Sequence, residues 1–171
     1  MSYFSQFSTT LYDPAGDGSA KLCTDIMSRV RVRASMKKEI IMLDPYDVKE
    51  NETPEIVADK HHGSPYYHWV VMILNDISDV NHDWVKSTRQ MQSYLTYKYT
   101  TTQLHETHHY EIPQTSGDTS VMIEVENTTY PEATSVSNYD YEIALNDSKR
   151  SISLLKNKYL SFFINEFEEI I

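Results

Sequence analysis

The sequence predicts an α+β protein built around a small strand–helix–helix–strand module that starts at Pro45. Tyr46-Asp47-Val48 alternates apolar and polar residues, which is the period of a half-buried strand. Thr53-Pro54 and Ser64-Pro65 each place an N-cap residue before a proline at the first helical position. After the second start, apolar side chains recur at the spacing of one helix face.

The first helix follows Thr53, whose hydroxyl can accept a hydrogen bond from an unpaired helical N–H. Glu55 places negative charge at the positive end of the helix dipole. Ile56 and Val57 provide the apolar edge, and Gly63 can end the helix in a left-handed cap.

The second helix is predicted from about Pro65 to Leu74. Apolar residues cover nearly all of its circumference, which predicts burial on two sides. Residues 77–84 are turn-rich and end in a large aromatic anchor. We expect a return strand to complete the β-α-α-β unit within residues 45–99, which also include a following helix that Ser87 or Thr88 could cap. The predicted module core is Tyr46, Val48, Ile56, Tyr66, Trp69, Val70, Ile73, Leu74 and Trp84.

Residues 1–24 form a predicted extended N-terminal arm. The arm is polar and contains the turn signals Asp13-Pro14 and Gly16-Asp17-Gly18, but it also carries several large apolar side chains. A segment of this composition cannot form a core alone, although it can lie along another surface. We expect it to be disordered in the free chain.

Residues 25–44 contain a basic strip and the lead-in to the module. Arg29, Arg31 and Arg33 alternate with valines, so the arginines would share one face of a strand. That face could bind phosphate, but an edge strand facing solvent or an acidic partner is the favoured interpretation.

The remaining chain predicts a β-hairpin region and a C-terminal strand and helix. Within residues 100–135, alternation at 105–112 and 121–126 around Gly117-Asp118 indicates an inserted hairpin. Residues 136–171 contain a weakly helical stretch at 139–149, a strand at 151–155 and an amphipathic helix from Tyr159.

The composition excludes several classes of function. The 171 residues carry a formal net charge of -10, which argues against generic nucleic-acid binding. Thirteen tyrosines are an unusual number; tyrosine combines contact area with a polar tip and suits an interface, but it is equally at home in a core or a strand. Cys23 is the only cysteine, so an internal disulfide is impossible. We see neither a secretory signal nor a membrane-length apolar run, and therefore expect an intracellular product without membrane partners.

His105-Glu106-Thr107-His108-His109 matches the H-E-x-x-H pattern of zinc metalloproteases. That chemistry needs both histidines on one face of a helix, but the surrounding threonines, the alternation and Pro113 favour a strand. On a strand, His105 and His109 would lie about 13 Å apart at roughly 3.3 Å per residue. The sequence therefore predicts no catalytic residue, metal site or cofactor; His61-His62 is also a poor chelating pair, because adjacent helical residues diverge.

The β-α-α-β unit resembles a LysM domain in its Tyr-x-Val strand, its Thr-Pro-Glu-Ile-Val helix start and the Asn-Asp pair after the second helix. In the run from Gly63 to Val71, followed by Asn75-Asp76 and Asp83-Trp84, it is more similar to the LysM-like wedge subunit family of contractile-tailed bacteriophage baseplates. The strip before the module and the closing segment at 149–155 also resemble this family, so the similarity covers most of residues 20–99 and 140–171.

The resemblance implies a structural component of the tail baseplate that joins neighbouring wedge subunits through protein contacts. Implied partners include the lysozyme-like sheath-initiating subunit, in multiple copies of a symmetric virion assembly formed in the host cytoplasm. We expect the partner contacts at Tyr3, Phe4, Phe7, Tyr12, Arg29, Arg31, Arg33, Phe163 and Phe167.

Two alternatives remain open at this point. Ordinary LysM modules bind N-acetylglucosamine-containing glycans such as peptidoglycan between two loops, which here are residues 49–53 and 76–81. Glu50 and Glu52 replace the usual glycine-aspartate turn of the first loop, which weakens the glycan-binding alternative. The other alternative is the zinc metalloprotease, through His105, Glu106 and His109.

Overall fold

The computed structural model describes residues 3–27, 41–117 and 120–170. The chain divides into two compact units, one made of Met1–Trp84 with Arg150–Ile171 and the other of Val85–Lys149. Both contain helices and small antiparallel sheets, so the predicted α+β class is confirmed. Within the described residues, no helix has the length and apolar character needed to cross a membrane.

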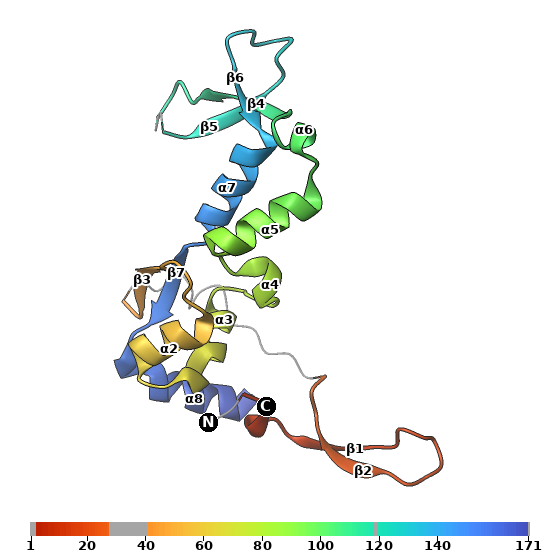
Figure 1. The fold of residues 1–171 in the computed structure, drawn as a ribbon. Helices are drawn as coiled ribbons and strands as arrows, with labels where there is room; N and C mark the ends of the chain where they lie inside the picture. Colours follow the sequence, from red (N-terminus) through yellow and green to blue (C-terminus); the bar gives the residue numbers. More distant parts are fainter. Residues whose placement is uncertain (1–2, 28–40, 118–119, 171) are drawn as a thin grey trace. The chain divides into compact units, whose positions relative to one another are not determined.

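The first unit contains the strand–helix–helix–strand order that the sequence predicts (Figure 1). Its elements are β3 (Leu43–Asp47), α2 (Pro54–His62), α3 (His68–Leu74) and β7 (Ser151–Leu155). β3 and β7 pair antiparallel, with Tyr46 opposite Ile152. The return strand expected within residues 45–99 is therefore wrong: residues 77–84 contain only the short α4 (Val80–Asp83), and the closing strand follows the entire second unit.

Local cap chemistry sets the helix ends of the module. The Thr53 side chain accepts a hydrogen bond from the Ile56 amide, and Gly63 ends α2 at φ 71°, where its N–H donates to the Asp59 carbonyl. Ser64 begins a 3-10 turn, η2 (Pro65–Tyr67), and α3 starts only at His68. The second helix is thus shorter than its predicted span.

Asn75 fastens α3 to the closing strand. Its side-chain Oδ1 accepts from the Ser153 amide at 2.8 Å, and its Nδ2 donates to the Ser153 carbonyl, also at 2.8 Å. The asparagine thereby satisfies backbone groups on the side of β7 that does not pair with β3.

An aromatic cluster forms the core around α3 and α8 (Asn157–Ile170). The rings of Trp69 and Phe167 lie 4.5 Å apart, and Phe163 and Phe7 complete the buried group. α8 is amphipathic as predicted, because its buried side chains repeat at helical spacing.

Most of the predicted module core is buried or half-buried. Val48, Trp69, Val70, Leu74 and Trp84 are buried, and Tyr46 and Ile73 are half-buried. Two residues need correction: Ile56 is 41% exposed and Tyr66 is 61% exposed. Tyr66 points outward because it lies in the 3-10 turn, whose three-residue period breaks the helical spacing that placed it on the apolar face.

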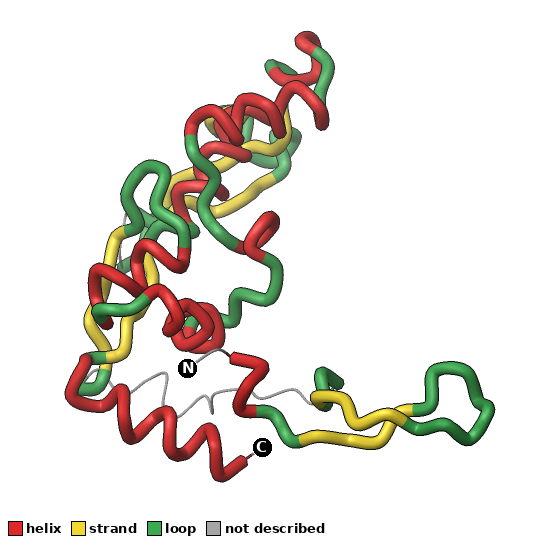
Figure 2. The backbone as a smooth tube through the Cα atoms, turned by 60° about the horizontal axis from the view of Figure 1, so that its bottom comes forward, coloured by secondary structure: helices red, strands yellow, loops and turns green. Residues whose placement is uncertain are grey.

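The N-terminal segment is ordered into a short helix and a hairpin. η1 (Tyr3–Gln6) precedes β1 (Thr9–Tyr12) and β2 (Lys21–Thr24), which pair antiparallel and run side by side in Figure 2. Every residue of both strands is exposed. The arm therefore contains defined secondary structure in the described residues. The predicted basic strip lies outside the described residues.

The second unit combines helices with a three-stranded sheet. α5 (Thr88–Lys98) starts at a capping box formed by Ser87 and Gln90, as the sequence indicates. The predicted hairpin is present, since β4 (Thr107–Pro113) pairs with β5 (Met122–Val125). The sequence did not predict that β6 (Thr134–Ser137) pairs on the other side of β4. α6 (Thr101–Leu104) and α7 (Asn138–Ser148) complete the unit.

The core of the second unit lies at its helical end. Val85, Met91, Leu95, Glu142 and Asn146 are buried. By contrast, no described residue between 101 and 140 is buried. The sheet therefore has no core of its own within this unit.

Candidate functional site

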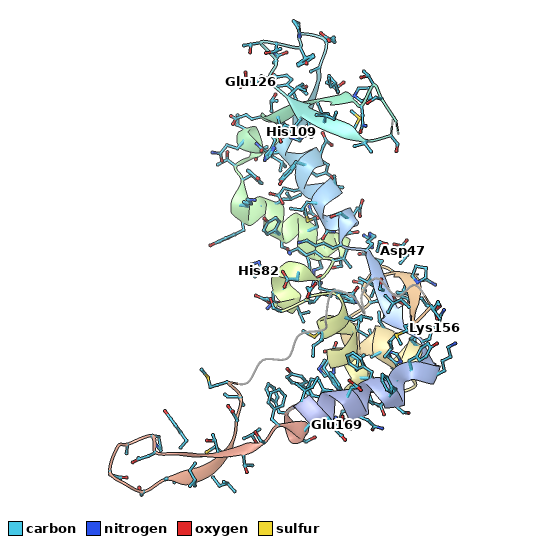
Figure 3. All side chains as sticks on the ribbon, turned by 180° about the vertical axis from the view of Figure 1, so that it is seen from behind. Asp47, His82, His109, Glu126, Lys156 and Glu169 are labelled. Atoms are coloured by element: carbon cyan, nitrogen blue, oxygen red, sulfur yellow. The ribbon has the colours of Figure 1, made fainter. Side chains whose placement is uncertain are left out.

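The H-E-x-x-H residues do not form a metal centre. His105 caps the end of α6, whereas Thr107 already begins β4, so the five residues span a turn and a strand rather than a helix. His109 lies on β4 in Figure 3, and its Nδ1 is 2.9 Å from Nδ1 of His108. The His108 ring stacks on Tyr141 of α7 at 3.8 Å. No group of three metal-ligating side chains occurs in the part of the chain that the structure describes.

His61 and His62 hold the end of α2 in place. Nε2 of His61 lies 3.0 Å from the Leu155 carbonyl, and Nδ1 of His62 lies 2.8 Å from Oδ1 of Asn157. Burial lowers the pKa of His62, so its neutral form is favoured in the fold. These contacts give both histidines a structural role in joining α2 to β7 and α8.

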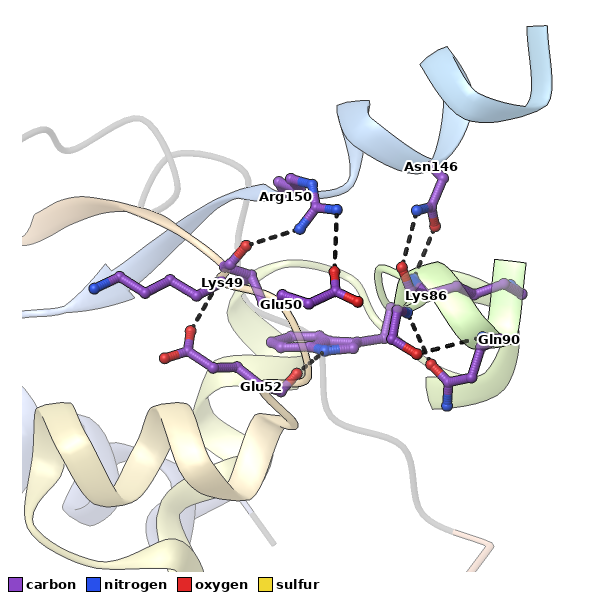
Figure 4. Close-up of polar contacts among 10 residues, drawn as sticks. Lys49, Glu50, Glu52, Lys86, Gln90, Asn146 and Arg150 are labelled. Carbon is purple, nitrogen blue, oxygen red and sulfur yellow. Dashed lines mark hydrogen bonds and ion pairs between the residues drawn. The ribbon is translucent and has the colours of Figure 1, made fainter. Parts of the chain in front are cut away.

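Residues 49–53 correspond to the first loop of the glycan groove in ordinary LysM modules, and here Glu52 of this loop forms hydrogen bonds within the module. The Glu52 carboxylate accepts hydrogen bonds from Tyr46 Oη and the Lys49 amide, both at 2.9 Å, and from Lys60 (Figure 4 shows the Lys49 contact). Burial alone would raise the pKa of Glu52, but these hydrogen bonds outweigh burial and the pKa lies below its ordinary value. Asn51 reaches this turn with a left-handed φ of 63°. The Glu52 carboxylate therefore makes its hydrogen bonds to other residues of the module.

The second loop of that groove is also closed internally. Oδ2 of Asp83 accepts from the amides of Ser78 and Asp79, both at 2.9 Å. Asp79 in turn caps α4. Trp84 Nε1, directly after α4, then donates to the Glu52 carbonyl of the first loop at 2.7 Å.

The predicted interface residues fall into three groups. Phe4 and Tyr12 are exposed, at 53% and 60%, and Tyr3 is half-buried against Phe7 and Trp69. Phe7, Phe163 and Phe167 are buried in the aromatic cluster, so in this fold their side chains belong to the core of the first unit. Their assignment as contacts is corrected because apolar spacing alone does not distinguish a partner's surface from the chain's own core. Arg29, Arg31 and Arg33 lie outside the described residues.

The N-terminal hairpin presents an apolar surface of which the predicted contacts include only Tyr12. Leu11 is 70% exposed, Leu22 is 68% exposed, and Ile26 and Met27 continue the surface after β2. Two short runs rich in β-forming residues flank an Asp-Pro and Gly-Asp-Gly turn, and that pattern could have revealed the hairpin.

The hairpin loop is preorganised by Asp13. Its carboxylate accepts from the amides of Gly18 and Gly16, both at 2.8 Å, and of Ala15 at 3.1 Å. The hydrogen bond from Gly18 is the largest cause of a lowered pKa at Asp13. The loop therefore has defined geometry although residues 14–20 are exposed to solvent.

An ion pair between a buried carboxylate and an exposed lysine joins α5 and α7 of the second unit. Glu142 of α7 accepts hydrogen bonds from Lys98 and, at 2.9 Å, from Tyr99 Oη. The Lys98 ammonium also lies over the rings of Tyr94 and Tyr99. Burial acts to raise the pKa of Glu142, but the hydrogen bonds outweigh it and the pKa is lowered.

The exposed apolar hairpin and the internally bonded loops of the module are the surfaces that this geometry defines. A family model described as base plate wedge protein 53 matches residues 21–133, which is more than half of the chain. The chain belongs to this family. As a base plate wedge protein it has a structural role in a phage baseplate, lies in the virion tail and assembles with other baseplate proteins in multiple copies.

The family match covers residues 100–133, which the sequence resemblance did not include, but it does not reach residues 140–171, which the resemblance did include. It includes β2, the helices of the module and the β4–β5 hairpin of the second unit. No curated protein matches the chain significantly. Neither the match nor the geometry supports the peptidoglycan-binding and metalloprotease alternatives.

Proposed function

We propose that this wedge protein joins neighbouring wedge subunits by protein–protein contact, with the N-terminal hairpin as a principal docking element. Its partners would include the lysozyme-like sheath-initiating subunit, and assembly would take place in the host cytoplasm. The observation that carries the proposal is an exposed apolar hairpin attached to a buried aromatic anchor.

The hairpin has the properties of an element that needs a partner. An isolated two-stranded hairpin is marginally stable in water, and its outer edges offer unpaired N–H and C=O groups. Leu11, Tyr12 and Leu22 add exposed apolar surface. A strand of a neighbouring subunit could pair with the hairpin edge by strand addition and cover these side chains with its own apolar residues.

The base of the hairpin is held firmly. The Asp25 amide donates to the Ser8 carbonyl at 2.9 Å, directly after Phe7 enters the aromatic cluster. A partner that binds the hairpin would therefore be connected to the core of the first unit rather than to a loose tail.

The module itself would serve as the rigid body of the contact. Its strand–helix–helix–strand order is consistent with a LysM-like fold, and the internal use of Glu52 supports a role without glycan. We further propose that Arg29, Arg31 and Arg33 contact an acidic surface of a partner, because the sequence places them on one face.

Reconstitution tests the hairpin directly. The full-length chain carrying Leu11→Ser and Leu22→Ser is mixed with the other wedge proteins of the same phage, each purified separately, and complexes are measured by native mass spectrometry. We expect loss of complex formation with at least one wedge protein, whereas Ile56→Ser, an exposed apolar change on α2, keeps it.

Normal complex formation by the double variant would refute the hairpin as a docking element. Absence of any complex with the unmodified chain would refute the broader proposal. Saturable binding of the unmodified chain to purified peptidoglycan would revive the glycan-binding alternative.

A further inference from the structure

Two adjacent histidines at the end of α2 contact the closing segment of the first unit, which consists of β7 and α8. Nε2 of His61 lies 3.0 Å from the Leu155 carbonyl, and Nδ1 of His62 lies 2.8 Å from Oδ1 of Asn157. Leu155 ends β7 and Asn157 begins α8, so both contacts join α2 to the place where the strand passes into the helix. The protonation of these rings therefore affects how firmly the closing segment is held.

The hydrogen-bond partners determine which nitrogen of each neutral ring carries the proton. Nδ2 of Asn157 donates to the His61 carbonyl at 2.7 Å, so the oxygen of the Asn157 amide is the atom that faces His62. That oxygen can only accept a hydrogen bond, and Nδ1 of His62 must therefore be the donor. By the same argument, the Leu155 carbonyl requires the proton of His61 on Nε2.

The other nitrogen of His62 is enclosed. Its Nε2 is shielded from solvent and has no hydrogen-bond partner among the described residues. A neutral imidazole leaves a lone pair at this place, whereas an imidazolium would put an N–H group and a positive charge there. Burying an unpaired charge costs far more than burying an unpaired lone pair. The fold therefore accommodates the neutral ring of His62 and resists the charged one.

The groups beside this contact add to that resistance. The His61 ring packs edge to face against His62 with ring centroids 4.8 Å apart, so a positive charge on one ring repels a charge on the other. The other titratable groups beside the contact are Tyr67 of η2, Asp59 one turn earlier on α2, and Lys156 and Lys158 on either side of Asn157. Asp59 is exposed, so solvent screens its carboxylate. Burial is the largest cause of the lowered pKa of His62; the hydrogen bond to Asn157 opposes it, and the charge of His61 adds to it.

We propose that His62 is an acid-sensitive latch, which holds the closing segment against α2 while the ring is neutral and loosens in mild acid. The unfolded chain takes up a proton at this histidine as the pH falls below 6.5, and the folded chain resists that proton. The stability that the latch contributes is therefore fully present above pH 6.5 and is lost as the pH falls below that value. A ring that stayed neutral in the fold would lower the folding equilibrium constant by roughly eightfold between pH 7 and pH 5.5, which sets the upper limit.

Nitrogen-15 NMR of the imidazole rings in the full-length chain tests the protonation directly. We expect His62 to carry its proton on Nδ1 and His61 on Nε2 at pH 7.5. On acidification, we expect the His62 ring to become charged at a lower pH than a histidine in an unfolded peptide. A His62 ring that carries its proton on Nε2, or that becomes charged with the ordinary midpoint near pH 6.5, would overturn the inference.

The variant His62→Asn separates the latch from the other titrating groups. Its amide can donate to Asn157 from nearly the position of the imidazole Nδ1, but it takes up no proton in this range. Urea unfolding is followed by tryptophan fluorescence, since both tryptophans lie in the first unit. Measurements between pH 7 and pH 5.5 stay above the range in which Glu52 and Glu142 lose their contribution.

We expect stability to decline less steeply with acid in His62→Asn than in the unmodified chain. The control His105→Asn also removes one histidine, but at an exposed position, and we expect it to reduce the decline less than His62→Asn does. Equal declines in the two variants, or an unaltered decline in His62→Asn, would overturn the inference. If His62→Asn does not fold, the NMR titration of the unmodified chain decides alone.

Discussion

Asn146 pairs with the backbone of a single residue, Lys86. Its Oδ1 accepts from the Lys86 amide at 2.8 Å, and its Nδ2 donates to the Lys86 carbonyl at 3.0 Å (Figure 4). Asn75 makes the same double contact with Ser153 in the first unit. In each unit an asparagine side chain thus takes the place of a neighbouring strand for one residue.

Replacing Asn146 with leucine should destabilise the second unit. The change leaves the Lys86 amide and carbonyl without their partner, and one unsatisfied buried group costs about 1–3 kcal/mol. Urea unfolding measures the loss, and amide hydrogen exchange locates it. We expect faster exchange in residues 85–149, whereas Asn75→Leu should accelerate exchange around β7. If each variant exchanged its amides equally fast in both units, the two asparagines would not act locally as proposed.

Trp69→Ala should lower the stability of the first unit by roughly 3–5 kcal/mol, the usual cost of truncating a buried aromatic. The Trp69 ring contacts Phe167, Phe163 and Tyr3, so its removal opens a cavity in the aromatic cluster. Trp69→Phe should cost clearly less, since it keeps a ring and removes an Nε1–H that has no hydrogen-bond partner in the structure. Thermal unfolding of both variants measures these losses of stability. An unchanged melting temperature for the alanine variant would show that this cluster is not a core.

Deleting the hairpin should impair assembly into wedges while leaving the fold of the rest of the chain stable. Deletion of residues 9–24 with a short glycine linker keeps Phe7 in its cluster, so we expect a near-normal melting temperature and impaired incorporation into wedges. Deletion of residues 1–8 should instead lower stability, because it removes Tyr3 and Phe7. Differential scanning calorimetry and wedge reconstitution are measured on both deletions. Normal incorporation of the hairpin deletion would show that the arm is dispensable.

Stability should fall in acid through Glu52 and Glu142. Both carboxyls have pKa values below the ordinary 4.5 in the fold, so the unfolded chain binds more protons as the pH drops. Their contribution is fully present above pH 4.5 and is lost as the pH falls below that value toward each folded pKa. Urea unfolding between pH 7 and pH 3 should show this decline.

Glu52→Gln should weaken that pH dependence and lower stability at neutral pH by about 1.5–3 kcal/mol, the range for a hydrogen bond to a charged group. The exposed control Glu168→Gln should leave neutral-pH stability nearly unchanged. A Glu52→Gln variant that retains the full acid slope would place the titration elsewhere.

Short-range chemistry explains which parts of the fold the sequence could predict. Thr53, Gly63 and Ser87 act on groups within four residues, so their roles as caps follow from the local sequence. The spacing along α8 likewise revealed an amphipathic helix. These signals do not depend on the rest of the chain.

Long-range pairing explains what could not be predicted. Tyr46 lies opposite Ile152, and no local pattern connects two strands so far apart in sequence. The same holds for Phe7: an apolar residue in a polar arm is compatible with a partner's surface or with the chain's own core, and only tertiary contacts distinguish them. The interface residues were the hardest to predict from the sequence, because an interface consists of the side chains that remain exposed after the chain has folded.

The separation of β3 from β7 has a consequence for synthesis. Chains leave the ribosome N-terminus first and domains generally fold as units, so Val85–Lys149 is complete before Ser151–Leu155 emerges. The residues translated after the second unit then close the first sheet and cover Trp69 with Phe163 and Phe167. A chain that terminates before β7 therefore cannot complete the sheet or the aromatic cluster of its first unit, even though most of that unit has already been synthesised.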